Sequence, residues 1–169
     1  MNKTIVITGA AGKLGSHVAQ SLIAANTNHT LRFASRDVAK LTAFKDAGHD
    51  ITTADFDNAD SLVQAFTGAD VALIISGDAP NDVRIAQHRR AIDAAKTAGV
   101  TRVVYTSFAN ATPSSKFTFA AIHADTEAHL KASGLAYTIL RNNAYAANLD
   151  GAIAGARENG VLAGYGAQG

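Results

Sequence analysis

Apolar and polar residues alternate in blocks along this chain, and each block has the length and spacing of a strand or a helix. Short apolar and β-branched runs, typical of buried parallel strands, cover residues 3–8, 30–35, 50–53, 71–75, 102–106 and 135–140. The segments between them favour helices at residues 14–25, 38–47, a stretch ending at Phe66, 81–98 and 117–132, with partly helical residues 144–159 at the end. Strands that alternate with helices in this way predict an α/β fold, a doubly wound parallel sheet with helices on both faces.

A glycine-rich turn joins the first predicted strand to the first predicted helix. It consists of Gly9, Ala10, Ala11, Gly12, Lys13, Leu14 and Gly15. A strand, a glycine turn and a helix form the first half of the βαβ unit with which the Rossmann fold binds dinucleotides. We expect Gly9 to turn the chain off the strand, Gly12 to admit a pyrophosphate, and Gly15 to let the helix pack closely on the strand. The alternative is a glycine-rich turn without a ligand, which the flanking strand and helix make the less favoured interpretation.

The end of the second predicted strand bears on which dinucleotide is bound. An NAD-preferring fold has Asp or Glu about twenty residues beyond the glycine turn, but Ser35 and Arg36 stand there. The Arg36 guanidinium can bind a 2′-phosphate and Ser35 can add a hydrogen bond, which favours NADP (NADPH) and leaves NAD as a second candidate. Asp37 is expected to cap the next helix. The alternative is that Arg36 is a surface arginine at the start of a helix.

Further candidate residues follow the third, fourth and fifth predicted strands, at the edge where open α/β sheets bind ligands. These candidates are Asp55, Phe56, Ser76, Gly77, Ser107 and Phe108. Asp55 and Phe56 could bind and cover an adenine, while Asp57 or Asn58 caps the following helix. On the helix at residues 81–98, Gln87, His88, Arg89 and Arg90 are consecutive, and we expect a solvated or interface-facing stripe there.

Composition excludes several classes of function. The 169 residues suit one domain, with 47% hydrophobic and 17% charged residues. A net charge of +1 argues against nucleic acid or a membrane surface as a partner. The chain has no cysteine, which excludes thiolate catalysis and Cys-based zinc sites, and its histidines lack metal-ligand spacing, so no metal is expected. No apolar run approaches a membrane span and the first strand begins early, so we expect a cytoplasmic protein.

The order and spacing of five segments resemble a known family. The segments are residues 9–15, Ser35-Arg36, Asp55-Phe56, residues 105–107 and residues 140–143. Together they resemble the NmrA-like atypical short-chain dehydrogenases/reductases, above all the bacterial NAD(P)H:quinone oxidoreductases and triphenylmethane reductases. The resemblance implies that residues 9–14 bind NADPH with Arg36 on the 2′-phosphate. It also implies cofactor contacts from Ser76, Gly77, Thr106, Ser107 and Phe108 and, near the nicotinamide, from Arg141, Asn142, Asn143 and Tyr145.

The helix at residues 117–132 lacks the Tyr-x-x-x-Lys pair that a typical short-chain dehydrogenase uses to protonate a carbonyl oxygen. It carries His123 and Glu127 instead, four residues apart and so on one face. The quinone-reductase-like members show the same pattern. An uncharged His123 could hydrogen-bond a substrate oxygen or the cofactor, with Glu127 orienting it. An exposed helical ion pair is the alternative, and the sequence leaves both open.

The resemblance implies an NADPH-dependent oxidoreductase that transfers hydride to a small quinone-like acceptor, or the cofactor-binding portion of one. The alternative is a non-catalytic NAD(P)-sensing regulatory protein. Members of the family continue past the segment that corresponds to residues 161–169 into a smaller substrate lobe. We therefore expect residues 1–169 to form a single NAD(P)-binding domain without that lobe. Apolar surface left bare by the missing lobe would lead the chain either to form a homodimer or to aggregate.

Overall fold

The structure is a computed structural model that describes residues 2–161, and within them the strands form one parallel sheet. The strands are β1 (Thr4–Ile7), β2 (Thr30–Ser35), β3 (Asp50–Thr53), β4 (Val71–Ile74), β5 (Arg102–Phe108) and β6 (Ala136–Asn142). Their order across the sheet is β3-β2-β1-β4-β5-β6, and every neighbouring pair is parallel. The predicted doubly wound sheet is confirmed. Since the strand order reverses between β1 and β4, a ligand crevice is expected at their carboxyl ends.

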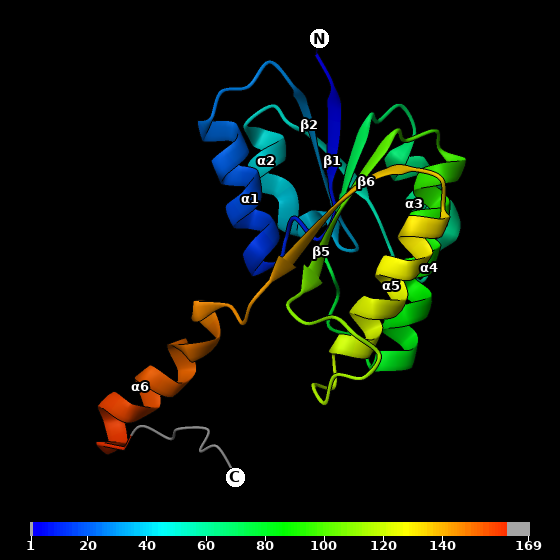
Figure 1. Ribbon diagram of the computed structural model, residues 1–169. Coiled ribbons are helices and arrows are strands. Elements are labelled where there is room, and N and C mark those ends of the chain that lie inside the picture. Colours follow the sequence, from blue (N-terminus) through cyan, green and yellow to red (C-terminus); the bar gives the residue numbers. More distant parts are fainter. Residues whose placement is uncertain (1, 162–169) are drawn as a thin grey trace.

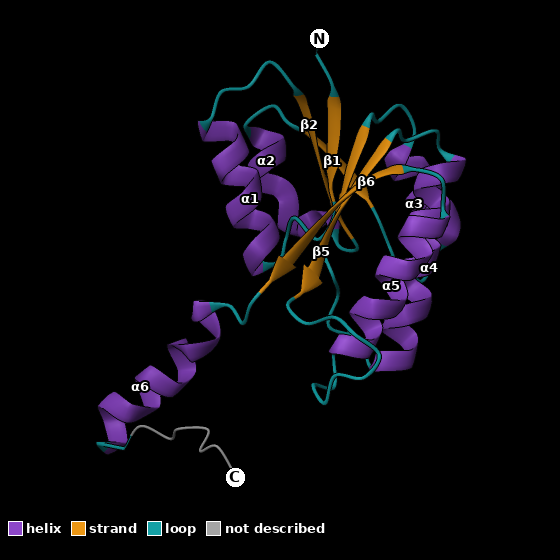
Figure 2. Ribbon diagram, viewed as in Figure 1, coloured by secondary structure: helices purple, strands orange, loops and turns teal. Residues whose placement is uncertain are grey.

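The helices cover both faces of the sheet, with α1 and α2 on one side and α3, α4 and α5 on the other (Figure 1). They are α1 (Lys13–Ala24), α2 (Thr42–Asp46), α3 (Ala59–Phe66), α4 (Asn81–Thr97), α5 (Ala120–Ala132) and α6 (Asp150–Asn159), with two 3₁₀ turns, η1 (Val38–Leu41) and η2 (Ala146–Leu149). Figure 2 shows the same layers by element type. The layers leave the carboxyl ends of the strands to be closed by loops.

Two helices differ from the sequence-based expectation. The helix expected over residues 38–47 is divided into η1 and the short α2, because Asp37 caps a 3₁₀ turn by accepting a hydrogen bond from the Ala39 amide. The helix expected from residue 117 begins at Ala120. Before it, the ring of Phe117 stacks on Phe108 at a centroid distance of 4.7 Å, which keeps this aromatic segment outside the helix and near the end of β5.

Each face of the sheet has its own apolar core. Val6 packs with Phe66 and Ile92 against α3 and α4, whereas Ile7 packs with Phe33 on the other face. Neighbouring residues of β1 thus point to opposite faces and both are fully buried, as the inner strand of a parallel sheet requires. These two cores fix the strand ends from which the loops of the cleft start.

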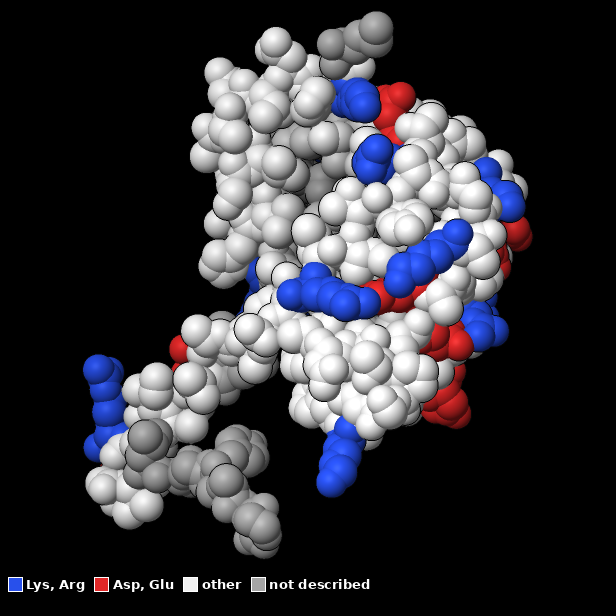
Figure 3. Space-filling model, viewed as in Figure 1, with Lys and Arg blue, Asp and Glu red and all other residues white. Residues whose placement is uncertain are grey.

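The outer surface of α4 and α5 is charged, whereas few charged side chains are visible over α1 (Figure 3). Arg89 on α4 pairs with Asp125 on α5 at 2.5 Å, and His129 on α5 lies 2.8 Å from Asp93 on α4. These contacts join the two helices on the side away from the sheet.

The last strand and helix expose apolar side chains. Leu140 on the edge strand β6 is exposed, as are Leu149 and Ile153 at α6, which extends away from the sheet and the other helices (Figure 1). Residues 162–169, most of the last segment that was compared with the family, lie outside the described residues. None of the helices formed by residues 2–161 combines the length and apolar character needed to cross a bilayer.

Candidate functional site

A cleft of about 780 Å³ lies at the carboxyl ends of β1 to β5. It collects most of the residues predicted to contact a cofactor. Those that line it are Gly9, Ala11, Gly12, Lys13, Leu14, Gly15, Ser35, Arg36, Asp55, Phe56, Ser76, Gly77, Thr106, Ser107, Phe108, Asn143 and Tyr145. Among the described candidates, Ala10, Arg141 and Asn142 do not line it. Ala10 is fully buried beneath the glycine turn, and its amide donates a hydrogen bond to the carbonyl of Ala34.

The glycine turn is packed so tightly that its shape depends on the missing side chains. Gly9 has φ +64°, which favours glycine. A Cβ on Gly15 would lie 2.1 Å from the Gly9 carbonyl oxygen, and one on Gly12 would lie 3.2 Å from the same atom. Gly15 therefore lets α1 approach the turn itself, not the strand as expected. The result is a backbone cradle at the N-terminus of α1, which fits a pyrophosphate.

Cationic side chains line the cleft beside the end of β2. Arg36 and Lys40 lie there, and Lys13 belongs to the adjoining glycine turn. The Asp37 carboxylate caps the following 3₁₀ turn, as predicted, by accepting a hydrogen bond from the Ala39 amide at 3.1 Å. Lys40 was not among the predicted residues, because nothing in its position within an expected helix points to a ligand. This cluster of three cations fits a 2′-phosphate.

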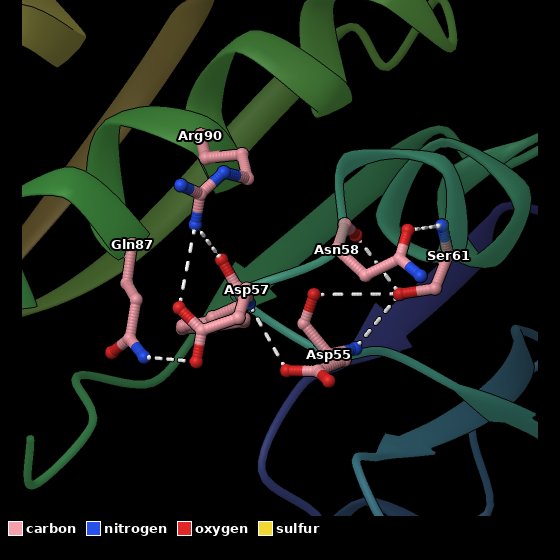
Figure 4. A network of polar contacts seen from close by, with 7 residues as sticks. Asp55, Asp57, Asn58, Ser61, Gln87 and Arg90 are labelled. Carbon is pink, nitrogen blue, oxygen red and sulfur yellow. Dashed lines mark hydrogen bonds and ion pairs between the residues drawn. The ribbon is translucent and has the colours of Figure 1, made fainter.

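The loop after β3 is held from α4 (Figure 4). The side-chain amide of Gln87 donates to Asp57 at 2.9 Å, and the Arg90 guanidinium donates to the Phe56 carbonyl and lies 3.6 Å from the Asp57 carboxylate. The expectation of a solvated stripe on α4 is therefore wrong for Gln87, which is buried and lines the cleft, and for His88, which is fully buried. Both belong to the inner face of α4 together with Ala91.

The same loop is fixed from α3 (Figure 4). Asn58 caps this helix, as the sequence suggested, by accepting from the Ser61 amide at 3.1 Å. The Ser61 hydroxyl accepts from the Asp55 amide at 3.0 Å, and the Asp55 carboxylate accepts from the Asp57 amide at 3.0 Å. The two residues predicted to cover an adenine, Asp55 and Phe56, are thus placed by contacts with two different helices.

At the other end of the cleft, His123 is joined to buried polar groups. Its Nδ1 lies 2.7 Å from the Tyr105 hydroxyl, and this hydroxyl lies 3.3 Å from Nδ1 of His88. Burial lowers the pKa of His88 to about 3, with a smaller contribution from His123. Burial and the nearby Arg84 charge lower the pKa of His123 to about 4. Both imidazoles are therefore neutral at pH 7, as the sequence analysis proposed for His123.

Glu127 lies one turn further along α5 and has a different set of partners. It accepts from the Ser107 hydroxyl at 2.7 Å, from Arg141 at 2.9 and 2.6 Å, and from Lys131 at 3.4 Å. Burial tends to raise the pKa of this carboxyl, but the hydrogen bonds from Arg141 and Ser107 and the Arg141 charge outweigh it and hold the pKa at about 2. Arg141 is thus engaged with Glu127, which explains why it does not line the cleft.

These contacts decide between the two interpretations of the His-x-x-x-Glu pattern. His123 is 6% exposed and Glu127 is 2% exposed, so an exposed helical ion pair is wrong. Within residues 2–161 no hydrogen bond joins the two side chains, and the expectation that Glu127 orients His123 is wrong as well. The hydrogen-bond partner of His123 is Tyr105 on β5 instead, and Glu127 ties α5 to the ends of β5 and β6.

Aromatic side chains line the cleft beside His123, and the sequence analysis did not single out all of them. Phe108 stacks on Phe117, whose ring meets that of Phe119 at 5.4 Å, and Arg84 lies 5.2 Å above Phe119. The ring of Phe108 also lies beside the imidazole of His123, with a centroid distance of 6.2 Å and an angle of 25° between the ring planes. A flat aromatic molecule fits such a wall, because ring faces stack on one another. In the part of the chain that the structure describes, no group of three or more metal-ligating side chains occurs.

Comparison with known proteins agrees with this geometry. The family described as NAD(P)H-binding matches residues 9–160. Quinone oxidoreductase 2 of Escherichia coli (strain K12) is 37% identical over 160 residues, which cover 95% of this chain and 55% of that protein. The chain spans about half the length of the curated relatives it matches.

Two solved structures are similar along nearly the whole chain. The NADPH complex of the quinone oxidoreductase QOR2 from Escherichia coli has a TM-score of 0.84 at 36% identity, covering 92% of this chain and 54% of that one. The NADP(H) complex of the triphenylmethane reductase from Citrobacter sp. has a TM-score of 0.83 at 32% identity, covering 92% and 55%. The resemblance inferred from the sequence is confirmed, and the glycine turn, the cleft and these matches together show that the chain belongs to the NAD(P)H-binding family.

Proposed function

We propose that this chain binds NADPH and belongs to a reductase that transfers hydride to a quinone-like acceptor, either as the enzyme itself or as its cofactor-binding portion. The observation that carries the proposal is one continuous cleft with a phosphate cradle and cations at one end and a neutral histidine among aromatic rings at the other. NADPH supplies a hydride, and with one proton from solvent this converts a quinone to a hydroquinone and leaves NADP⁺. The enzyme quinone oxidoreductase 2, 37% identical, supports this acceptor class.

Each part of the cleft has a distinct task in this proposal. The amides at the N-terminus of α1 bind the pyrophosphate, and Arg36, with Lys40 nearby, binds the 2′-phosphate. The anchored loop that contains Phe56 covers the adenine. The nicotinamide then lies over the ends of β4 and β5, where the Ser76 amide donates to the Thr106 hydroxyl at 2.9 Å. This places the reacting carbon near His123 and the aromatic wall.

The preference for NADPH over NADH tests the end of the cleft that is proposed to bind the 2′-phosphate. Arg36→Ala removes charge-assisted hydrogen bonds to the 2′-phosphate, so NADPH affinity should fall by about ten- to hundredfold while NADH affinity is unchanged. Isothermal titration of both nucleotides measures this. Arg89→Ala, which removes an exposed arginine paired with Asp125 outside the cleft, is the matched control and should change neither affinity. Equal losses for NADPH and NADH in Arg36→Ala would contradict the proposed preference.

Oxidation of NADPH by quinones tests the end of the cleft that contains His123 and the aromatic rings. It also distinguishes an enzyme from the NAD(P)-sensing alternative. Steady-state oxidation of NADPH, followed by its absorbance with a panel of benzoquinones and naphthoquinones, should show acceptor-dependent rates. A sensor would bind oxidised and reduced cofactor and oxidise no NADPH with any quinone. The aromatic wall favours the enzyme, since a sensor needs no surface for a second flat ring beside the nicotinamide.

We also propose a homodimer that works in the cytoplasm and binds neither nucleic acid nor membranes. The exposed side chains of Leu140, Leu149 and Ile153 support self-association, because apolar surface of this kind is buried favourably against a second copy. Multi-angle light scattering gives the mass in solution. A monomer at all concentrations would contradict the dimer, and co-sedimentation with lipid vesicles would contradict the absence of membrane binding.

A further inference from the structure

The hydrogen bonds around His88 have fixed directions, because a backbone amide can only donate and a carbonyl can only accept. The Gly77 amide donates to Nε2 of His88 at 3.4 Å. A neutral His88 whose Nε2 accepts must carry its proton on Nδ1. The Thr126 hydroxyl donates to the Ile122 carbonyl at 2.9 Å. The Thr126 oxygen is therefore free to accept from Nδ1 of His88, which lies 2.9 Å away.

These directions determine what Tyr105 does. Its hydroxyl oxygen lies 3.3 Å from the protonated Nδ1 of His88, so the hydroxyl cannot donate there. It accepts instead, and the His88 Nδ1–H forms a bifurcated hydrogen bond to Thr126 and Tyr105. The hydroxyls of Ser76 and Thr126 are close enough to act on the Tyr105 pKa, but the short contact open to its own hydrogen is Nδ1 of His123 at 2.7 Å. Burial raises the pKa of the Tyr105 hydroxyl, which therefore keeps its proton at pH 7. Tyr105 thus acts as a donor to His123.

The donor role of Tyr105 determines which tautomer His123 presents to the cleft. A neutral His123 whose Nδ1 accepts from Tyr105 carries its proton on Nε2. Within residues 2–161, every side-chain nitrogen or oxygen that is fully shielded from solvent has a hydrogen-bond partner. Nε2 of His123 has no partner among these residues, so it is open to the cleft that His123 lines.

We propose that Tyr105, held by His88, is a positioning residue that fixes His123 in its Nε2–H tautomer and so presents a neutral hydrogen-bond donor to the acceptor's carbonyl oxygen. The part about the acceptor rests on the proposed function. Negative charge develops on this oxygen as hydride reaches a quinone, and a donor already fixed in place stabilises it without reorganisation. Within residues 2–161 no hydrogen bond joins Glu127 to His123, and Glu127 acts there through its negative charge, which tends to raise the pKa of His123.

The tautomer can be measured without cofactor or acceptor. In protein labelled with ¹⁵N-histidine, long-range ¹H–¹⁵N spectra at pH 7 distinguish a protonated ring nitrogen from a bare one, and His123→Gln assigns the signals. We expect a bare Nδ1 and a protonated Nε2 for His123. A protonated Nδ1, or a doubly protonated ring, would overturn the inference whether or not the protein reduces quinones.

Tyr105→Phe tests the role of the hydroxyl, and Tyr137→Phe, which removes the hydroxyl of an exposed tyrosine on β6, is the matched control. In Tyr105→Phe the His123 signals should move toward a mixture of tautomers, and kcat/KM for a quinone should fall roughly three- to tenfold, the effect of losing one neutral hydrogen bond, with NADPH affinity unchanged. An unchanged Nε2–H tautomer in folded Tyr105→Phe would overturn the proposal. A tautomer that shifts as expected in a protein without any quinone reduction would overturn the proposal that this chain is itself the reductase and leave the role of Tyr105 standing.

Discussion

The buried Glu127 should contribute more to stability than the carboxylates on the surface of the chain, and Glu127→Gln measures that contribution. The substitution keeps the shape of the side chain but removes the charge and turns one acceptor into a donor facing Arg141 or Ser107. Breaking a buried ion pair costs about 3–5 kcal/mol. The Arg141 side chain is 50% exposed, and solvent screens its half of the pair. We therefore expect the free energy of unfolding to fall by about 2–3 kcal/mol.

The pKa of Glu127 gives a second route to the same magnitude. The carboxyl has a pKa of about 2 when folded and 4.5 when unfolded. A lowered pKa in the folded state stabilises the protein above pH 4.5, and the stabilisation is lost as the pH falls toward 2. The difference corresponds to about 3 kcal/mol at pH 7, before screening reduces it. About two-fifths of it should be lost at about pH 3.5.

Urea unfolding followed by circular dichroism, at neutral and acidic pH, tests both statements. A separate thermal melt at pH 7 should show a melting temperature lower by about 5–10 °C in Glu127→Gln. Asp125→Asn is the matched control. It neutralises another carboxylate of α5 that is also paired with a half-exposed arginine, but the Asp125 side chain is 28% exposed whereas that of Glu127 is 3% exposed, so the change should cost about 1 kcal/mol or less. Equal losses for the two variants, or a difference between wild type and Glu127→Gln that does not shrink in acid, would refute the reasoning.

Three further predictions concern other parts of the cleft. Gly15→Ala brings a Cβ to 2.1 Å from the Gly9 carbonyl oxygen, so thermal melting should show a free energy of unfolding lower by about 2 kcal/mol or more, and titration should show no NADPH binding. Gly151→Ala is the control and should behave as wild type, because its Cβ would meet nothing within 4 Å. In the folded state His88 and His123 have pKa values of about 3 and 4, whereas both histidines take up protons below about pH 6.5 in the unfolded chain. The free energy of unfolding should therefore fall by about 2–4 kcal/mol between about pH 7 and pH 5. Equal urea midpoints at the two pH values would contradict this. Gln87→Ala releases the loop after β3, so NADPH affinity should fall by about three- to tenfold in a titration, and unchanged affinity would show that the loop needs no anchor.

The sheet and the glycine turn could be predicted because their signals are local. Apolar runs of strand length and the spacing of Gly9, Gly12 and Gly15 depend on neighbouring residues alone. The inner face of α4 was missed although its spacing is regular. One face of this helix is formed by residues at regular helical spacing: Arg84, Gln87, His88, Ala91 and Ile92. Because three of them are polar, the pattern indicated an exposed face rather than a buried one.

The partners of His123 and Glu127 could not be predicted, because they depend on how α5 lies against the sheet. Four-residue spacing correctly placed both on one face of a helix. Tyr105 precedes His123 by 18 residues and Arg141 follows Glu127 by 14, and each comes from a strand beneath α5. Pattern alone does not specify which of these side chains each residue of α5 meets.

The position of α4 also limits how the length of this chain can vary. Arg84 contacts the aromatic wall at one end of the cleft, and Arg90 holds the adenine loop at the other. An inserted residue after Gln87 would rotate Arg90 by about 100° away from Phe56 while Arg84 kept its place. Insertions and deletions that preserve binding should therefore be absent from this helix and should occur in segments such as the loop residues 112–116, which do not line the cleft.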